Sequence, residues 1–177
     1  MQPTNGGDTS VLAALFRHNT WATLKMLDFC ATLSDEQLDA SAPGTFGSIR
    51  ATLRHIVGAE ASYVGRVTGR RPAKPLGPGF PDFATLKEVA RWTGDELLDL
   101  ALSARADSVV EERDPDVKAV ARYPLASLML QAINHATEHR THVSTILTVL
   151  GLEPPDTSGW AYMVETGEFQ ETREDGA

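Results

Sequence analysis

Apolar side chains recur every three to four residues along four stretches of the chain, which is the spacing of amphipathic helices. The first stretch runs from about residue 10 to residue 33, and Val11, Leu15 and Leu27 lie on its apolar side. The others span about 48–68, 85–104 and 124–150. The pattern therefore predicts four long helices.

Local signals at the helix ends support this division. Ser48 is a favourable N-cap for the second helix, and "SDEQ" at 34–37 and "TLKE" at 85–88 have the capping-box spacing. Pro124 suits the first turn of the last helix, and Gly151 suits its C-terminal cap. We expect a short helical turn after Ser34 and a third long helix that begins at the second capping box.

The segments between the predicted helices carry no strong pattern. Residues 69–83, "GRRPAKPLGPGFPDF", are rich in proline and glycine, and 105–121 is polar with only a weak strand tendency at Val109 and Val110. The predicted fold class is therefore all-α, a helical bundle with short extra helices. We expect a single domain over 1–177, with 1–8 flexible and 165–177 a loosely ordered tail.

The composition of the chain limits which partners it can bind and where it can be located. The formal net charge of −8 opposes binding to nucleic acid, because such binding depends on lysine and arginine at the phosphates. No apolar run approaches the length of a membrane span, and the first ten residues lack the pattern of a signal peptide. We expect a cytoplasmic protein that acts on a small molecule, without nucleic-acid or membrane partners.

The single cysteine, Cys30, excludes an intramolecular disulfide and a thiolate-rich metal site. It lies in the apolar run "LDFCATL". We expect an inert core residue there rather than a nucleophile.

Histidines cluster on the last predicted helix. The segment "INHATEHRTHV" contains His135, His139 and His142, three of the five histidines of the chain. At about 100° per residue, His139 and His135 point toward the interior and His142 lies at the edge of the apolar stripe. Two imidazoles at positions i and i+4 can reach one metal ion, but two hydrogen-bonded core histidines would produce the same spacing. Spacing alone leaves both interpretations open.

Glu138 completes an H-x-x-E-H pattern, which inverzincin metalloproteases use with the glutamate as general base. Those proteases are much larger and resemble this chain nowhere else, so we expect Glu138 to be an exposed helix residue. A third metal ligand would have to come from His55 or His18. A helical wheel places His55 away from the apolar centre of its helix, so periodicity favours neither histidine.

Four segments in order resemble the DinB-like superfamily, also called DinB/YfiT-like: "NTWA", "GSIRATLRHIVGAE", "NHATEHR" and "GLEPPD" followed by "WAY". The resemblance covers most of the chain. It implies a four-helix bundle with an up-down-down-up course, a homodimer, and a divalent ion held by three histidines. The positions that match the family's ligands are His55, His135 and His139.

Several residues depart from the family pattern or need separate interpretation. Thr23 stands where many relatives have asparagine, and Thr141 with His142 replaces their Gly-Gln. His142 is either a partly exposed rim residue or an extra group near the ion. Glu60, in the middle of an apolar arc, is either a ligand or acid/base group or, as we favour, a structural partner of a residue such as Arg140.

The aromatic residues Trp160 and Tyr162 follow the last long helix. Trp21, Trp92 and Trp160 are most simply core or interface residues, and the alternative for Trp160 and Tyr162 is that they cover the site.

Three neutral imidazoles leave coordination positions open on an ion such as Zn²⁺, as in catalytic sites, and Ni²⁺, Fe²⁺, Mn²⁺ or Co²⁺ would also fit. The resemblance implies an S-transferase or isomerase in which the metal activates a low-molecular-weight thiol. A hydrolase that uses metal-bound water and a non-catalytic metal-binding bundle are the alternatives.

Overall fold

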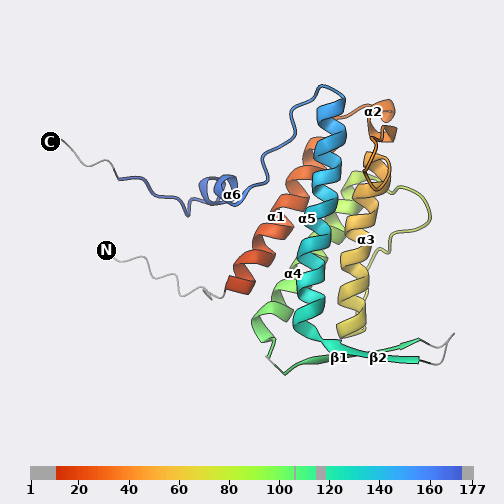
Figure 1. The fold of residues 1–177 in the computed structure, drawn as a ribbon, viewed down its shortest axis with the longest axis vertical. Coiled ribbons are helices and arrows are strands. Elements are labelled where there is room, and N and C mark those ends of the chain that lie inside the picture. The colour runs from red at the N-terminus through yellow and green to blue at the C-terminus, as the bar shows by residue number, and fades with distance from the viewer. Residues whose placement is uncertain (1–10, 106, 115–118, 173–177) are drawn as a thin grey trace.

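The computed structural model describes residues 11–105, 107–114 and 119–172, and these residues are mostly helical with a small two-stranded sheet (Figure 1). Residues 1–8, predicted to be flexible, and the last five residues of the predicted tail lie outside the described part. Four helices are long, and they pack side by side: α1 (Val11–Cys30), α3 (Ile49–Thr68), α4 (Phe83–Ser103) and α5 (Leu125–Val149). Two are short: α2 (Asp35–Asp39) and α6 (Gly159–Glu165).

The caps confirm two of the predicted starts and correct a third. Ser34 forms the predicted capping box with Gln37, and the Ser48 hydroxyl accepts a hydrogen bond from the backbone N–H of Ala51. Helix α4, however, begins before the predicted capping box at 85–88. Its N-cap is Asp82, whose carboxylate accepts from the backbone N–H of Thr85 at 2.6 Å. A carboxylate is a strong cap because it also interacts favourably with the positive end of the helix dipole.

A β-hairpin joins α4 to α5, in a region where the all-α prediction expected no strands. Strand β1 (Val109–Asp114) pairs antiparallel with β2 (Ala119–Pro124), with Val109 opposite Pro124. Among the described hairpin residues only Val110 is buried. An exposed ribbon needs little apolar alternation, so its sequence contained only a weak strand signal.

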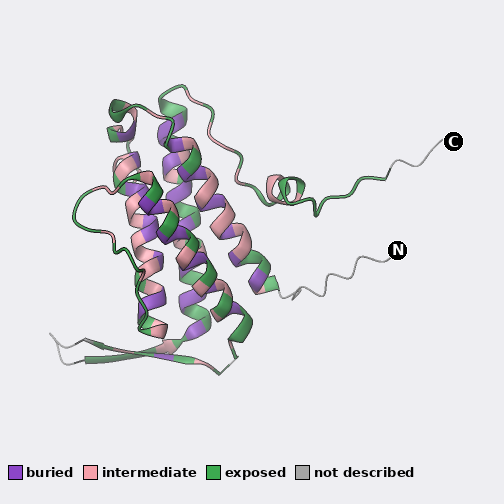
Figure 2. Cartoon of the chain, turned by 180° about the vertical axis from the view of Figure 1, so that it is seen from behind, coloured by how far each residue is buried: buried purple, intermediate pink, exposed green. Residues whose placement is uncertain are grey.

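Buried residues lie along the inner faces of the long helices (Figure 2), and the buried apolar residues form two clusters along the length of these helices. The upper cluster combines the C-terminal halves of α1 and α5 with the N-terminal halves of α3 and α4: Met26, Leu27, Leu53, Val57, Val89, Val143 and Ile146. The lower cluster combines the opposite halves: Phe16, Val64, Leu97, Leu128 and Met129. Cys30 is buried in the upper cluster, and burial raises the pKa of its thiol to about 12, which confirms the predicted inert core residue.

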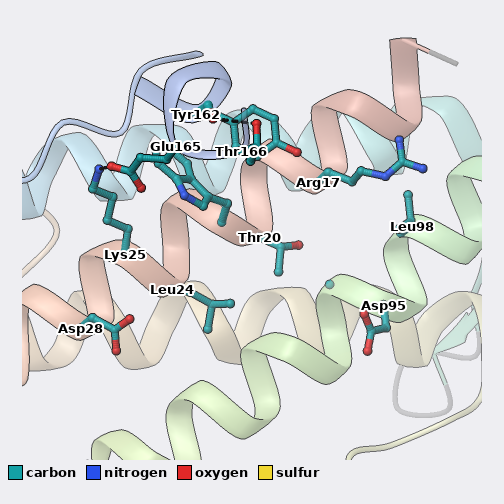
Figure 3. A pocket seen from close by; sticks show the side chains of 12 residues that line it. Arg17, Thr20, Leu24, Lys25, Asp28, Asp95, Leu98, Tyr162, Glu165 and Thr166 are labelled. Atoms are coloured by element: carbon teal, nitrogen blue, oxygen red, sulfur yellow. Dashed lines mark hydrogen bonds and ion pairs between the residues drawn. The ribbon is translucent and has the colours of Figure 1, made fainter. Parts of the chain in front are cut away.

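Helix α6 lies beside α1 rather than among the long helices (Figure 1). The His18 ring donates to the carbonyl of Thr157 at 2.9 Å, and Lys25 forms an ion pair with Glu165. These contacts place α6 over one side of a cleft of about 530 Å³ between α1 and α4 (Figure 3). No described helix has the length and apolar character required to cross a membrane.

Candidate metal centre

Three of the histidines converge between α3 and α5. His55 comes from α3, and His135 and His139 come from successive turns of α5. Each offers a ring nitrogen, and these three nitrogens all lie within 4.8 Å of one another. The Nε2 atoms of His55 and His135 are 2.9 Å apart. The packing of α3 on α5 therefore brings His55, which its own helical wheel did not favour, to the pair on the last long helix.

The loop before α3 supplies an aromatic wall that the sequence analysis missed. The Phe46 ring stacks on His55 with 4.1 Å between centroids and 18° between planes, and it forms a T-shaped pair with His139 at 4.9 Å between centroids. Phe46 stays about half exposed, at 49%. The sequence did contain a signal for this residue, an aromatic side chain in the glycine-containing turn "PGTFGS". A phenylalanine in such a turn belongs to no helix with an apolar face, so it has to pack against another part of the protein.

The three imidazoles are held in the neutral form that metal ligation requires. Burial is the main cause that lowers the pKa of each, and the neighbouring histidines lower the pKa of His135 and His139 further. The pKa of His139 falls to about 4. The negative charge of Glu138 acts in the opposite direction but does not outweigh burial. At neutral pH the nitrogens therefore present lone pairs without first losing a proton.

His142 lies against the cluster. Its Nδ1 is 3.2 Å from Nδ1 of His139, and its side chain is partly buried. It is thus both a rim residue and a neighbour of a candidate ligand. With Nδ1 of His139 occupied by this hydrogen bond, Nε2 is the ring nitrogen left to face an ion.

The donor set fits a divalent transition-metal ion. Zn–N bonds of about 2.0–2.1 Å at tetrahedral angles separate ligand nitrogens by about 3.3 Å. This value lies between the 2.9 Å that separates the Nε2 atoms of His55 and His135 and the 4.8 Å within which all three nitrogens lie. Nδ1 of His135 is buried without a hydrogen-bond partner among the described residues. Nε2 of the same ring lies 2.9 Å from Nε2 of His55 and is the nitrogen that could bind an ion. The cluster could therefore hold a metal.

Other residues considered in the sequence analysis lie elsewhere. His18 contacts Trp21 and Tyr162 beside α6, and Glu138 is exposed on α5. The described ring contacts of Trp160 and Tyr162 are with Phe169, His18 and Trp21. The alternative that these two aromatics cover the histidines was wrong, because the chain after α5 turns toward α1.

Comparison with protein-family models matches residues 1–174 to the DinB family. The chain belongs to the DinB family. A search of curated proteins found no match.

In this DinB-family chain a buried polar network lies between the two apolar clusters and links all four long helices. The carboxylate of Glu60 accepts from Asn19 Nδ2 at 2.8 Å and from the Thr93 hydroxyl at 3.1 Å. Arg140 donates to Asn19 Oδ1 at 2.8 Å and to the Thr23 hydroxyl at 2.9 Å. Glu60 thus has the expected structural role, and its connection to Arg140 runs through the amide of Asn19.

The ionisation of this network follows from its burial. Burial lowers the pKa of Arg140 to about 10 and is opposed by the charge of Glu60, so the guanidinium stays protonated at neutral pH. Burial raises the pKa of Glu60, while Asn19, Arg140 and Thr93 act to lower it. The Thr23 hydroxyl accepts a hydrogen bond from Arg140. The network sits next to the histidines, because Arg140 follows His139 on α5.

Proposed function

We propose that this DinB-family protein binds one divalent transition-metal ion through His55, His135 and His139. The observation that supports this proposal best is the convergence of the three ring nitrogens within 4.8 Å. Zn²⁺ suits an all-imidazole donor set, and Ni²⁺, Fe²⁺, Mn²⁺ and Co²⁺ are compatible with it. Three protein ligands are the number typical of catalytic zinc sites, in which a further position stays open to a reactant.

We propose further that the protein is a thiol-dependent S-transferase or isomerase for a small-molecule substrate. A bound divalent ion supplies a Lewis acid that stabilises a low-molecular-weight thiol as its nucleophilic thiolate. The chain contributes neutral imidazoles, and the half-exposed ring of Phe46 borders the site on the side of the α2–α3 loop. An apolar wall of this kind excludes water from the reacting sulfur and helps to orient an electrophile.

A thiol requirement tests this function. With Zn²⁺ restored to the purified protein, we expect a small thiol and an alkyl halide or epoxide to yield the thioether conjugate faster than without protein. The rate should return to background in EDTA and in the His139→Ala variant. Mass spectrometry of the product distinguishes the alternatives. Water addition to the electrophile without thiol would instead favour a hydrolase, and metal binding without either product would favour a non-catalytic bundle.

His142 should position His139 for ligation. Replacing His142 by alanine removes the hydrogen bond at Nδ1 of His139, and loss of such an outer partner typically weakens metal binding by about 10–100-fold. Competition with a chromophoric chelator measures this affinity. His142→Gln, which retains a hydrogen-bonding group, should recover part of the loss. Equal affinities of the parent and the His142→Ala variant would contradict this positioning role.

We also propose that the four long helices follow the up-down-down-up course of the family within a single domain over 1–177. In support, the N-terminal halves of α1 and α5 share the lower apolar cluster with the C-terminal halves of α3 and α4.

A homodimer is proposed from the family resemblance. Exposed apolar side chains on α1 and α6 offer a surface for it: Val11, Leu15, Trp160 and Val164. Sedimentation equilibrium would contradict this by finding a monomer. A cytoplasmic location stays a prediction.

A further inference from the structure

Two clefts flank His55 on the side of α3 that faces the loop 69–82. One, of about 470 Å³, lies between α3 and this loop, and its lining includes Arg54, His55, Ser62, Arg71 and Leu76. We call it the Arg54–Arg71 cleft. The other, of about 460 Å³, lies toward Phe46 and Phe80. Arg54 and His55 line both, so a molecule in either cleft would lie beside a candidate metal ligand.

The Arg54–Arg71 cleft is positively charged in a chain of net charge −8. Among the residues that the structure describes, its lining contains two arginines and no acidic residue. Several other arginines of the described chain are paired with carboxylates, as Arg50 is with Asp35 and Arg70 is with Glu96. No ion pair of Arg54 or Arg71 is found within the described ranges. A concentration of unpaired guanidinium groups in a concave surface attracts anions.

Arg54 has an unused hydrogen-bond donor. Its Nη2 donates to the carbonyl of Gly77 at 2.8 Å, which ties the loop to α3. Its Nε is buried and has no partner among the described residues. A buried N–H of this kind normally finds an acceptor, and the cleft beside it is where a ligand oxygen could supply one.

The position of Arg71 depends on a glycine. A Cβ placed on Gly65 would come within 1.4 Å of Nη1 of Arg71, so the guanidinium lies where the glycine leaves room on α3. Pro72 and Pro75 restrict the loop that carries it. The local chain geometry thus holds both arginines at the same cleft, and Leu76 adds an apolar wall.

We propose that the Arg54–Arg71 cleft binds the carboxylate or phosphate group of a small molecule whose reactive atom lies at the ion beside His55. This inference rests on the proposed metal-dependent function and specifies its substrate class as an anionic thiol or an anionic electrophile. Guanidinium groups recognise carboxylate and phosphate oxygens through paired charge-assisted hydrogen bonds. The cleft volume is within the range of small-ligand sites, and its apolar wall suits a carbon skeleton.

Two small thiols of similar size test the cleft in Co²⁺-loaded protein. Binding of 3-mercaptopropionate and of neutral 2-mercaptoethanol is followed by the near-ultraviolet thiolate-to-cobalt charge-transfer band. We expect the carboxylate-bearing thiol to bind the parent about tenfold more tightly. This preference should disappear in Arg54→Gln and Arg71→Gln, while the affinity for 2-mercaptoethanol stays unchanged. Arg91→Gln is the matched control. Arg91 is exposed and lies outside the cleft, so this substitution removes the same charge elsewhere, and the variant should keep the preference for 3-mercaptopropionate.

A second measurement needs neither metal nor thiol. Propionate and inorganic phosphate are titrated into metal-free protein while the arginine Nε–H signals are followed by NMR. Saturable shifts of Arg54 and Arg71, with Arg91 unmoved, would support the cleft, and the anion that saturates at lower concentration identifies the preferred group. The folded state of each variant is checked by circular dichroism, and Arg54→Lys, which keeps the charge, should retain part of the preference.

The results of these two experiments distinguish failure of the proposed anion-binding cleft from failure of the proposed thiol-dependent function. Equal binding of the two thiols together with unmoved arginine signals would overturn the cleft and leave the thiol-dependent function standing. Arginine signals that shift with propionate while neither thiol produces a charge-transfer band would support the cleft and overturn the thiol function. Loss of the preference in Arg91→Gln to the same extent would also overturn the cleft, because net charge alone would then explain it.

Discussion

Replacing His139 by alanine is expected to reduce bound metal from about one ion per chain to nearly none. The same result is expected for His55→Ala. Each substitution removes one of the three proposed ligand nitrogens, which lie within 4.8 Å of one another, and we expect the affinity for the ion to fall by more than the roughly 100-fold typical of outer partners. Elemental analysis of protein purified without affinity-tag histidines measures the effect.

His18→Ala is the control for this experiment. His18 is also a partly buried histidine, but it hydrogen-bonds to the carbonyl of Thr157 and lies outside the cluster. This variant should keep its ion. A parent protein that stays metal-free after purification with excess metal would contradict the site, as would an equal loss of metal in His18→Ala.

Arg140→Met is expected to lower the free energy of unfolding by about 3–5 kcal/mol, because it removes two buried charge-assisted hydrogen bonds, to Asn19 and to Thr23, each of which contributes about 1.5–3 kcal/mol. Arg140 is 4% exposed and Glu60 is 2% exposed. Without the guanidinium, the Glu60 carboxylate would keep its cost of burial but lose the favourable charge of Arg140. Urea unfolding of metal-free protein measures the change without a contribution from ion binding.

Two further variants show whether the network causes this loss. Arg91→Met alters an exposed arginine and should change stability by no more than about 0.5 kcal/mol. Adding Glu60→Leu to Arg140→Met removes the uncompensated carboxylate, so the double variant should lose less than the sum of the single losses. Strictly additive losses would contradict coupling through Asn19.

The long helices were predictable because the 3.6-residue apolar period reports burial directly. The predicted ranges match α1, α3, α4 and α5 to within a few residues, and the largest deviations are at the ends. The start of α4 was misplaced because Asp82 and Thr85 both precede residues with helical spacing, and a sequence pattern does not rank competing caps. The hairpin was not predicted because most of its described residues are exposed, and exposed strands show little apolar alternation.

The residues of the candidate site were also only partly predictable from the sequence. His135 and His139 share one helix, so their proximity follows from helical spacing alone. His55 was identified only by family resemblance, because a helical wheel reports the average apolar direction of a helix and does not say which neighbour lies along its edge. The position of Phe46 and the shape of the Arg54–Arg71 cleft depend on loops, and the path of a loop is not indicated by any periodic pattern in the sequence.

The sequence by itself determined the positions of the long helices, the pairing of two histidines on one face, and the buried place of Cys30 and Glu60. All of these follow from residues close together in the chain, whose relative geometry the helix imposes. Only the tertiary structure decided that α3 lies against α5, that Asn19 connects Glu60 to Arg140, and that Arg71 lies over Gly65. These relations join residues far apart in sequence, and they depend on how side chains of different helices and loops pack together.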